Sequence, residues 1–380
     1  VSGELDNSFD PGDFIEIYAT RNDGWLDKDL YRRPEEHTNP YRSLFSDSSV
    51  YFLTISKTLA QKRVVDYYNG NYSNKKADNY FNHEIVYTHG KDFYSGIPVN
   101  NDAAQAFSEY TEGEGFHTWI WSSQKRIDIS TPSIYQNGPA ANIDIVAFSS
   151  TNNKDVIVNN YNHEFGVSIG KKSNSIAKVK TLGHSKIRIN QSFNNSNISN
   201  TTKVYLGEIT FESSGINLTY FKLRYPRLFD LNNSSKLKVV SDSFDSKYFK
   251  FTNYPSDKNN PTIYDFLNNH RVLADKSLLH DIEFNLSSVA ANSSFYISDK
   301  SDIKSIPNSS FREKHFSEII PSKNINYLII TNKTLEKGAK NYEGYRSSTL
   351  GGAYNTYIAY VDDLYDQFSF GYEHPLAIKN

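Results

Sequence analysis

Residues 326–380 limit the possible folds of this chain more than any other stretch. Tyr327–Thr331 is a short apolar run with β-branched residues, which is typical of a buried parallel strand. A helical segment follows, and Gly351–Gly352 ends it. Tyr354–Val361 then predicts a second strand. The helical segment is indicated by residues that recur three and four positions apart: Leu335, Ala339, Tyr342 and Tyr345.

Strand, helix, glycine turn and strand together form one βαβ unit. Such a unit has a right-handed crossover and needs further strands beside it. His374–Asn380 predicts the start of another helix, because proline stands near its first turn, and the sequence stops inside it. We therefore expect this chain to be the front part of a longer protein, truncated where an α/β domain begins.

Between about residues 60 and 300 the sequence predicts strand after strand at short, even spacing. Apolar residues alternate with polar ones in several runs, which indicates one buried and one solvated face. Clusters rich in Asn, Gly and Ser separate these runs and are typical of loops. Many short strands of this kind predict a sandwich or a barrel. The clearest alternating residues are Ile143, Ile145 and Ala147, then Phe165, Val167 and Ile169, and then Phe221, Leu223 and Tyr225.

The expected fold class is mainly β: an antiparallel, jelly-roll-like β-sandwich followed by one βαβ unit. The sequence predicts a β-rich amino-terminal segment with an acidic turn (1–60), the sandwich (61–300), a linker (301–325) and the start of the α/β domain (326–380). Within the first segment, Phe14–Tyr18 and Tyr51–Ile55 are the predicted strands.

Proline interrupts one of the strongest predicted strands at Tyr225–Arg227. Because proline cannot donate a hydrogen bond to a ladder, we expect this strand to lie at a sheet edge or to bulge there. An edge position would let Arg227 pair with a carboxylate between domains.

Composition excludes several classes of function. The net charge is −2, which gives no sign of a nucleic-acid partner. No apolar run reaches the length of a transmembrane segment. The chain has no cysteine, so it offers no disulfide, no thiolate metal ligand and no cysteine nucleophile of its own. The 28 Tyr and 24 Phe residues provide a large apolar area despite a modest aliphatic content.

Three aspartates surround a Pro-Gly turn near the amino terminus: Asp6, Asp10 and Asp13. Carboxylates at this spacing can bind calcium, which makes the turn a candidate metal site and calcium the one possible cofactor. The alternative is a solvated turn before a strand, because the loop lacks the full ligand pattern of an EF-hand.

A second candidate site is the stretch 107–121, which gathers Glu109, Glu112, Glu114, His117 and Trp119. Paired carboxylates hydrolyse glycosides, and an aromatic ring beside polar groups suits a sugar, so the stretch is a candidate glycan or metal site. The alternative is a hairpin with glycines at its turn and charges on its solvated face, since carboxylates need a cleft to act as acid and base.

The histidines show no spacing typical of a helical zinc site. His89-Gly90 matches a dipeptide that some cysteine peptidases use, but it precedes the predicted α/β domain by many residues. A catalytic histidine must lie beside its nucleophile. We therefore interpret the dipeptide as the end of a strand.

An ordered series of short matches resembles the gingipain-type cysteine peptidases of Bacteroidetes, and in particular the sortase members that act in type IX secretion. Four matches lie in the opening of the peptidase domain: Tyr327–Thr331, Asn341–Arg346, Asp363–Phe368 and His374–Asn380. The others resemble the region that precedes that domain: Asn7–Tyr18, Asn22–Asp27, Asn39–Tyr41, Tyr51–Thr54 and Tyr225–Arg227.

The resemblance implies that residues 326–380 begin a caspase-like α/β domain whose catalytic His and Cys lie beyond Asn380. It implies a secreted, periplasmic or outer-membrane and cell-surface protein, whose parent is a cysteine endopeptidase with sortase-like activity. This chain would then be inactive alone. Its expected role is to support and orient the downstream peptidase domain, its main partner, with type IX secretion components or cargo proteins as further partners.

The alternative function is a free-standing adhesive or carbohydrate-binding sandwich that uses the stretch 107–121. Exposed coplanar aromatic side chains would favour it. An incomplete α/β unit with an unpaired strand edge counts against it.

Overall fold

The computed structural model describes residues 11, 14–54, 64–98, 110–121, 123–150, 160–210, 215–240, 244–291, 293–317, 319 and 324–379. The chain divides into two compact units, each assembled from three stretches of sequence. Unit 1 comprises Val1–Ile17, Thr58–Ile97 and Phe116–Ser305, and unit 2 comprises Tyr18–Lys57, Pro98–Gly115 and Ile306–Asn380. The predicted fold class is confirmed, while the four predicted domain ranges stay a prediction.

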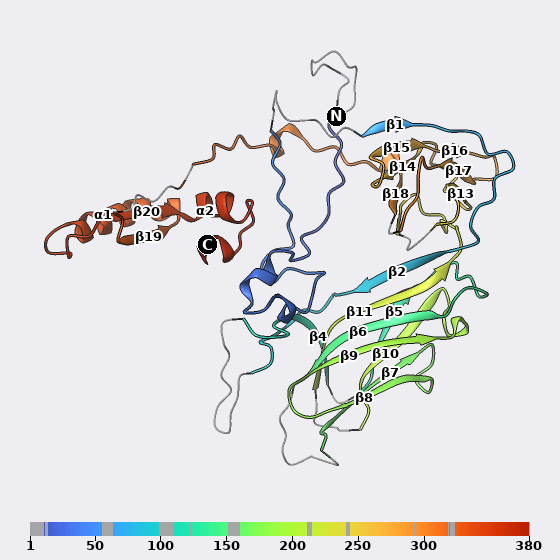
Figure 1. Ribbon diagram of the computed structural model, residues 1–380, viewed down its shortest axis with the longest axis horizontal. Helices are drawn as coiled ribbons and strands as arrows, with labels where there is room; N and C mark the ends of the chain where they lie inside the picture. The colour runs from blue at the N-terminus through green and yellow to red at the C-terminus, as the bar shows by residue number, and fades with distance from the viewer. Residues whose placement is uncertain are drawn as a thin grey trace. The chain divides into compact units, whose positions relative to one another are not determined.

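Two antiparallel sheets form the sandwich of unit 1 (Figure 1). The six-stranded sheet has the order β3 (Asp92–Tyr94), β4 (Gly115–Trp121), β11 (Gly215–Arg227), β6 (Ala141–Ser149) and β9 (Ser185–Phe193), with β2 (Phe81–Tyr87) also paired to β11. The four-stranded sheet has the order β5 (Lys125–Ser130), β10 (Thr201–Glu208), β7 (His163–Ile169) and β8 (Ser175–Thr181).

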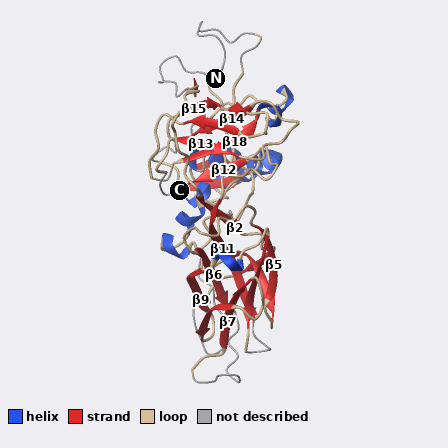
Figure 2. Cartoon of the chain, turned by 90° about the vertical axis from the view of Figure 1, so that its right-hand side faces the viewer, coloured by secondary structure: helices blue, strands red, loops and turns tan. Residues whose placement is uncertain are grey.

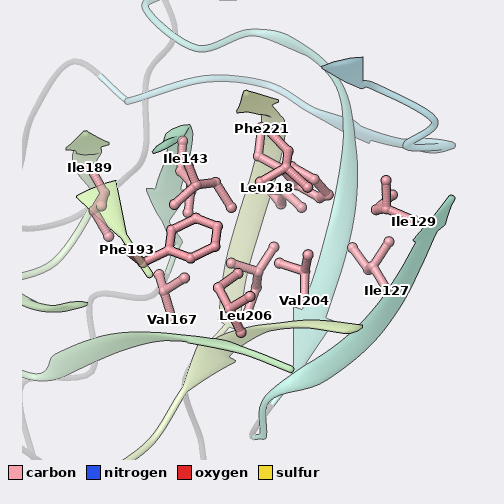
Figure 3. Close-up of a cluster of buried hydrophobic side chains, with 14 of the residues drawn as sticks. Ile127, Ile129, Ile143, Val167, Ile189, Phe193, Val204, Leu206, Leu218 and Phe221 are labelled. Carbon is pink, nitrogen blue, oxygen red and sulfur yellow. The ribbon is translucent and has the colours of Figure 1, made fainter. Parts of the chain in front are cut away.

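The alternating apolar residues of these strands meet between the two sheets. Figure 3 shows side chains of β5, β7 and β10 pointing toward those of β6, β9 and β11. All nine residues that alternation assigned to the core are buried, including Ile143, Phe165 and Phe221. Burying each large apolar side chain contributes roughly 1.5–3 kcal/mol, so this layer is the main source of stability for the sandwich.

Unit 1 also contains a second group of strands (Figure 2). Phenylalanine is the most frequent residue in the core of this group. Its rings contact one another at centroid distances such as 5.3 Å for Phe249 and Phe284. One sheet has the order β1 (Val65–Tyr67), β15 (His270–Leu273), β14 (Pro261–Asp265), β18 (Ser294–Asp299) and β12 (Leu237–Val240). The other has the order β13 (Tyr248–Phe251), β17 (Ile282–Asn285) and β16 (Asp275–Lys276).

Unit 2 contains the predicted βαβ unit. Its elements are β19 (Tyr327–Thr331), α1 (Glu336–Ser347), β20 (Thr356–Tyr360), α2 (Val361–Phe368) and α3 (Leu376–Lys379). Short 3₁₀ helices complete the described structure: η1 (Asp27–Leu30), η2 (Pro34–Glu36), η4 (Asn195–Asn197), η5 (Lys300–Asp302), η6 (Asn308–Ser310) and η7 (Lys333–Leu335).

The prediction of two amino-terminal strands was wrong where the structure describes them. Residues 15–18 and 51–54 are irregular, and residue 55 lies outside the described residues. In the first of these segments, Glu16 accepts a hydrogen bond from the Tyr264 hydroxyl and pairs with Arg271 at 3.3 Å. The preference for strand depends strongly on context, and at Glu16 these side-chain contacts replace a ladder.

The strand with the internal proline is central, so the expectation of an edge was wrong. β11 pairs with β6 on one side and with β2 on the other. Proline is tolerated there because the β6 ladder ends at Arg224, before Pro226 is reached. Arg227 is buried and donates to the backbone carbonyl of Asp230 at 2.8 Å, and the expected pair with a carboxylate is not found among the described residues.

Matched leucine substitutions test which surfaces carry the stability of unit 1. Leu206 is fully buried in the sandwich, whereas Leu278 in the turn between β16 and β17 is 99% exposed. We predict that Leu206→Ala lowers the free energy of unfolding by about 2–5 kcal/mol, and that Leu278→Ala changes it by less than about 0.5 kcal/mol. Urea unfolding followed by circular dichroism measures both, and equal effects would contradict the assignment of the core.

Candidate functional site

The three aspartates of the candidate calcium turn, Asp6, Asp10 and Asp13, lie outside the described residues. The calcium site therefore stays a prediction. Within the described ranges no group of three or more His, Asp or Glu side chains is placed to hold a metal ion.

The stretch 107–121 does not act as one acidic cluster in the structure. Glu109 lies outside the described residues, and the rest is divided between the units: Glu112 and Glu114 belong to unit 2, and His117 and Trp119 to β4 of unit 1. One Glu114 oxygen accepts from the Thr111 backbone N–H at 3.2 Å, and burial raises the pKa of the Glu114 carboxyl. This carboxylate thus closes a local turn.

His89-Gly90 lies one residue beyond the end of β2, in line with its interpretation as a strand end. The His89 ring contacts Tyr87 edge-on at a centroid distance of 5.5 Å. Gly90 packs against the backbone of His117, where a Cβ would come within 2.0 Å of the carbonyl carbon. This close approach requires glycine for packing and assigns the dipeptide no catalytic role.

The structure instead points to unit 2, where two distant stretches of sequence build one buried contact. The first is the arm, which we define as residues 18–54. The second is the carboxy-terminal segment, which we define as residues 324–379. We take each in turn and then describe how the arm contacts the segment.

The carboxy-terminal segment has the predicted parallel pairing. β19 and β20 pair in register from Tyr327↔Thr356 to Thr331↔Tyr360. Arg346 at the end of α1 places its guanidinium 4.5 Å from the ring centroids of both Tyr327 and Tyr354, a cation–π arrangement that fixes the helix to the sheet.

The expected burial of β19 is not observed. Leu328 and Ile330 are exposed, and among the predicted apolar positions of α1 only Ala339 is buried. The physical reason is that β20 is the sole described neighbour of β19, so the sheet has two strands and one of its faces stays uncovered beside Leu328.

Hydrogen bonds between side chains and backbone groups hold the two ends of the arm together. The Asn22 side chain donates to the Ser46 carbonyl at 2.8 Å and accepts from the Gly24 N–H at 3.0 Å. Gly24 has φ +83°, and a Cβ there would meet Asp27 and the Ser43 backbone at 2.9 Å. Glycine at this position therefore leaves the space that the Asp27 carboxylate occupies.

Asp27 is the buried centre of the contact. Its carboxylate accepts from the Leu44 backbone N–H at 2.7 Å, from the Ser43 hydroxyl at 3.2 Å and from His374 Nε2 at 3.0 Å. The side chains of Asp27 and His374 are only 1% and 3% exposed. A buried charge is tolerated when several donors surround it, and this carboxylate has three.

His374 has both ring nitrogens engaged. Nδ1 accepts from the Leu376 backbone N–H at 3.1 Å, at the start of α3. Because Nδ1 is an acceptor, the proton of a neutral imidazole lies on Nε2 and is donated to Asp27; this tautomer is inferred from the hydrogen-bond network. The imidazole is thus held as a structural bridge between the arm and α3 and has no free nitrogen for acid–base work.

Apolar and aromatic contacts surround the bridge. Leu376 packs in a buried cluster with arm residues Leu26, Leu30 and Tyr31. The Phe45 ring meets the His374 imidazole edge-on at a centroid distance of 4.8 Å. Burial raises the pKa of the Tyr31 hydroxyl, which donates to the Glu114 carbonyl at 3.3 Å. These contacts exclude water from the bridge, which strengthens its hydrogen bonds.

Further contacts extend along the arm. Trp25 contacts Phe370 at a ring centroid distance of 5.6 Å, and Phe52 contacts Phe316, which precedes the carboxy-terminal segment, at 5.0 Å. Gly371 has φ +81°, and a Cβ there would lie 2.6 Å from the Phe52 ring. The arm and the carboxy-terminal segment therefore approach each other at several points.

Sequence reasoning found both halves of this site without joining them. Asn22–Asp27 and His374–Asn380 were singled out as separate matches, yet the Asp27 and His374 positions are 347 residues apart. The sequence shows only that Asp27 lies near Gly24 and that His374 precedes Pro375. Such a pattern is too common to predict that the two side chains meet.

Comparison with known proteins confirms the resemblance seen in the sequence. Residues 320–380 match the family model of peptidase family C25. The fold is similar to that in the crystal structure of dimeric latent PorU from Porphyromonas gingivalis, with a TM-score of 0.52 and 13% identity. That likeness covers 83% of this chain and 29% of the PorU chain, so this chain spans less than a third of that protein.

Two further likenesses are weaker and cover 37% of this chain. One is to the CBM36-1 domain of a multidomain xylanase from the hindgut metagenome of Trinervitermes trinervoides, with a TM-score of 0.22, 13% identity and 96% of that chain covered. The other is to carbohydrate-binding module CBM36 in complex with calcium and xylotriose, with a TM-score of 0.22, 10% identity and 98% covered. No curated protein matches the sequence.

A pair of Gly→Ala substitutions tests the close approach at Gly371. Gly371→Ala adds a methyl group against Phe52 at a positive φ, so we predict that unit 2 becomes less stable by about 1–3 kcal/mol. Gly338→Ala is the control: it lies in α1 with nothing within 4 Å of the new Cβ, so we predict a gain of about 0.5–1 kcal/mol. Unfolding followed by the fluorescence of Trp25, with Trp119 and Trp121 replaced by Phe, reports on unit 2; destabilisation by both would refute the steric account.

A double-mutant cycle tests the buried bridge. We predict that Asp27→Ala and His374→Ala each lower the stability of unit 2 by about 3–5 kcal/mol, because each leaves its partner buried without a counterpart. The double variant should lose less than the sum of the single losses, by about 0.5–3 kcal/mol. The same Trp25 fluorescence measures all three, and strict additivity would show that the two side chains do not interact.

Proposed function

We propose that this chain is the non-catalytic amino-terminal region of a gingipain-like cysteine peptidase or sortase, and that it supports and orients the peptidase domain that follows. The observation that carries the proposal is the buried bridge between Asp27 of the arm and His374 of the segment that matches peptidase family C25. Through this bridge the arm holds α3, an element of that segment, in place.

The chemistry of the chain agrees with a supporting role. Peptide cleavage by this class needs a thiolate activated by a neighbouring base. The chain has no cysteine, and His374 uses both nitrogens for structure. We therefore assign the nucleophile and its base to the part of the protein that follows residue 380.

The exposed face of the βαβ unit gives that downstream part a place to pack. Leu328 and Ile330 are exposed on β19, whose second edge is unpaired among the described strands. A parallel strand in a caspase-like domain is covered on both faces. We propose that further strands and helices of the peptidase domain cover Leu328 and Ile330.

The proposed setting is type IX secretion at the cell envelope, where cargo proteins and secretion components would be the further partners. This setting rests on the likeness to PorU and on the sortase-like matches in the sequence. Across the described residues, no helix combines the length and the apolar character needed to cross a membrane.

The test uses the full natural protein that carries this chain. We predict that it cleaves a peptide from the carboxy-terminal domain of a cargo protein, that alkylation with iodoacetamide abolishes cleavage, and that residues 1–380 alone are inactive. Asp27→Asn should lower kcat/KM at least about tenfold by loosening the arm, while the exposed matched control Asp29→Asn should leave it unchanged. Cleavage that resists alkylation, or equal effects of the two variants, would contradict the proposal.

A further inference from the structure

Two exposed tryptophans lie side by side on β4. They take no part in the contacts that are proposed to support the peptidase domain. Trp119 is 36% exposed and Trp121 is 52% exposed. Their ring centroids are 5.7 Å apart, with an angle of 22° between the planes. Because β4 alternates, Ile120 enters the sandwich core while both tryptophans face the outer side of the six-stranded sheet.

Gly215 lets the Trp119 ring lie against the backbone of the neighbouring strand. Gly215 is opposite Trp121 in register, and a Cβ there would meet two carbons of the Trp119 ring at 2.6 Å. The side chain therefore extends diagonally over β11, which is within reach of a large aromatic residue. A supported ring with an exposed surface forms a rigid platform, and its near-parallel neighbour Trp121 enlarges it.

Polar groups lie beside this platform. The Ser150 hydroxyl is 3.2 Å from the same Gly215 Cβ position and donates to the Gly215 carbonyl at 2.9 Å, so its oxygen lone pairs remain available. Asn217 is opposite Trp119 in register and therefore lies on the same face. Asn217 is buried, and its side-chain nitrogen has no hydrogen-bond partner among the described residues. Because this nitrogen is closed off from solvent, a ligand on the platform does not reach it, which leaves the Ser150 hydroxyl as the accessible polar group.

The charge beside the platform narrows the choice of ligand. Asp92 places a carboxylate oxygen 3.1 Å from the Trp119 backbone nitrogen, from which it accepts a hydrogen bond. A carboxylate here repels phosphate, which disfavours nucleic acids even though bases stack on aromatic rings. A neutral sugar fits better, because its ring has an apolar face of C–H groups for the tryptophans and hydroxyls at its edge for polar neighbours.

We propose that Trp119 and Trp121 form a binding site for a neutral glycan, which stacks a pyranose ring on the platform and bonds through a hydroxyl to Ser150. The site is independent of the proposed peptidase support and lies wholly in unit 1. The outer face of the sandwich therefore binds neutral glycans in this proposal.

The test is affinity electrophoresis of the whole chain through gels that contain soluble β-glucan, mannan, galactan or xylan. At least one polymer should retard the wild-type chain. Trp119→Ala and Trp121→Ala should each weaken that binding by about tenfold, while Trp119→Tyr should keep part of it. The control is Leu278→Ala, which removes an apolar side chain of the same unit that is more exposed than either tryptophan. This variant should bind as wild type.

Circular dichroism shows whether each variant is folded, and Trp119→Tyr keeps the test decisive if Trp119→Ala does not fold. Failure of all four polymers to retard the wild-type chain would overturn the proposal. So would retardation that survives both alanine substitutions, or self-association that Trp121→Ala abolishes without any glycan binding. None of these outcomes bears on peptide cleavage by the full protein, so this proposal and the proposed function fail separately.

Discussion

The hydrogen bond between Asp27 and His374 is the interaction on which unit 2 depends, because it joins the two ends of the sequence at a buried point. Removing two polar side chains from water is costly, and an apolar pair of the same size often stabilises a protein equally well. Such a pair makes the position of the arm specific. Any other position of the arm would leave a buried carboxylate or imidazole without its partner. Leu44, Ser43 and Leu376 supply the other hydrogen bonds that make one arrangement better than its alternatives.

Unit 1 has large buried cores although the chain is poor in aliphatic residues. In the sandwich, Ile, Val and Leu from both sheets interlock with a few rings. In the second strand group, phenylalanines such as Phe249, Phe251, Phe284 and Phe295 contact one another edge-on or stacked. Aromatic side chains bury large areas each, which explains how a chain with a hydrophobic content of 38% supports this much buried structure.

Local patterns predicted those parts of the fold in which local preference and burial agree. Alternation identified the buried faces of β6, β7 and β11, and helical spacing with a glycine turn identified the βαβ unit. The predictions failed where distant partners decide. Residues 15–18 are strand-like in sequence but have no ladder partner in the part of the chain that the structure describes. Pro226 lies in a central strand because a neighbouring ladder ends just before it. The burial of β19 was predicted from its apolar residues, yet burial needs neighbours that the described structure does not contain.

The candidate site was harder to predict for the same reason. Nothing near Asp27 in the sequence indicates that its partner is His374. Trp119 was noted only as an aromatic residue beside carboxylates, and it is Gly215 on another strand that explains why its ring can lie on the sheet. Both candidate sites depend on contacts between residues that are distant in the sequence, whereas sequence patterns predict mainly the structure of neighbouring residues.

Hydrogen exchange with mass spectrometry on this chain tests the central claim most directly. If the Asp27–His374 bridge couples the arm to α3, Asp27→Asn will make the backbone amides of residues 24–30 and 370–379 exchange faster together, while strands β6 and β11 keep their protection. If residues 370–379 keep wild-type protection while residues 24–30 lose theirs, the arm does not hold the carboxy-terminal segment and the account is wrong.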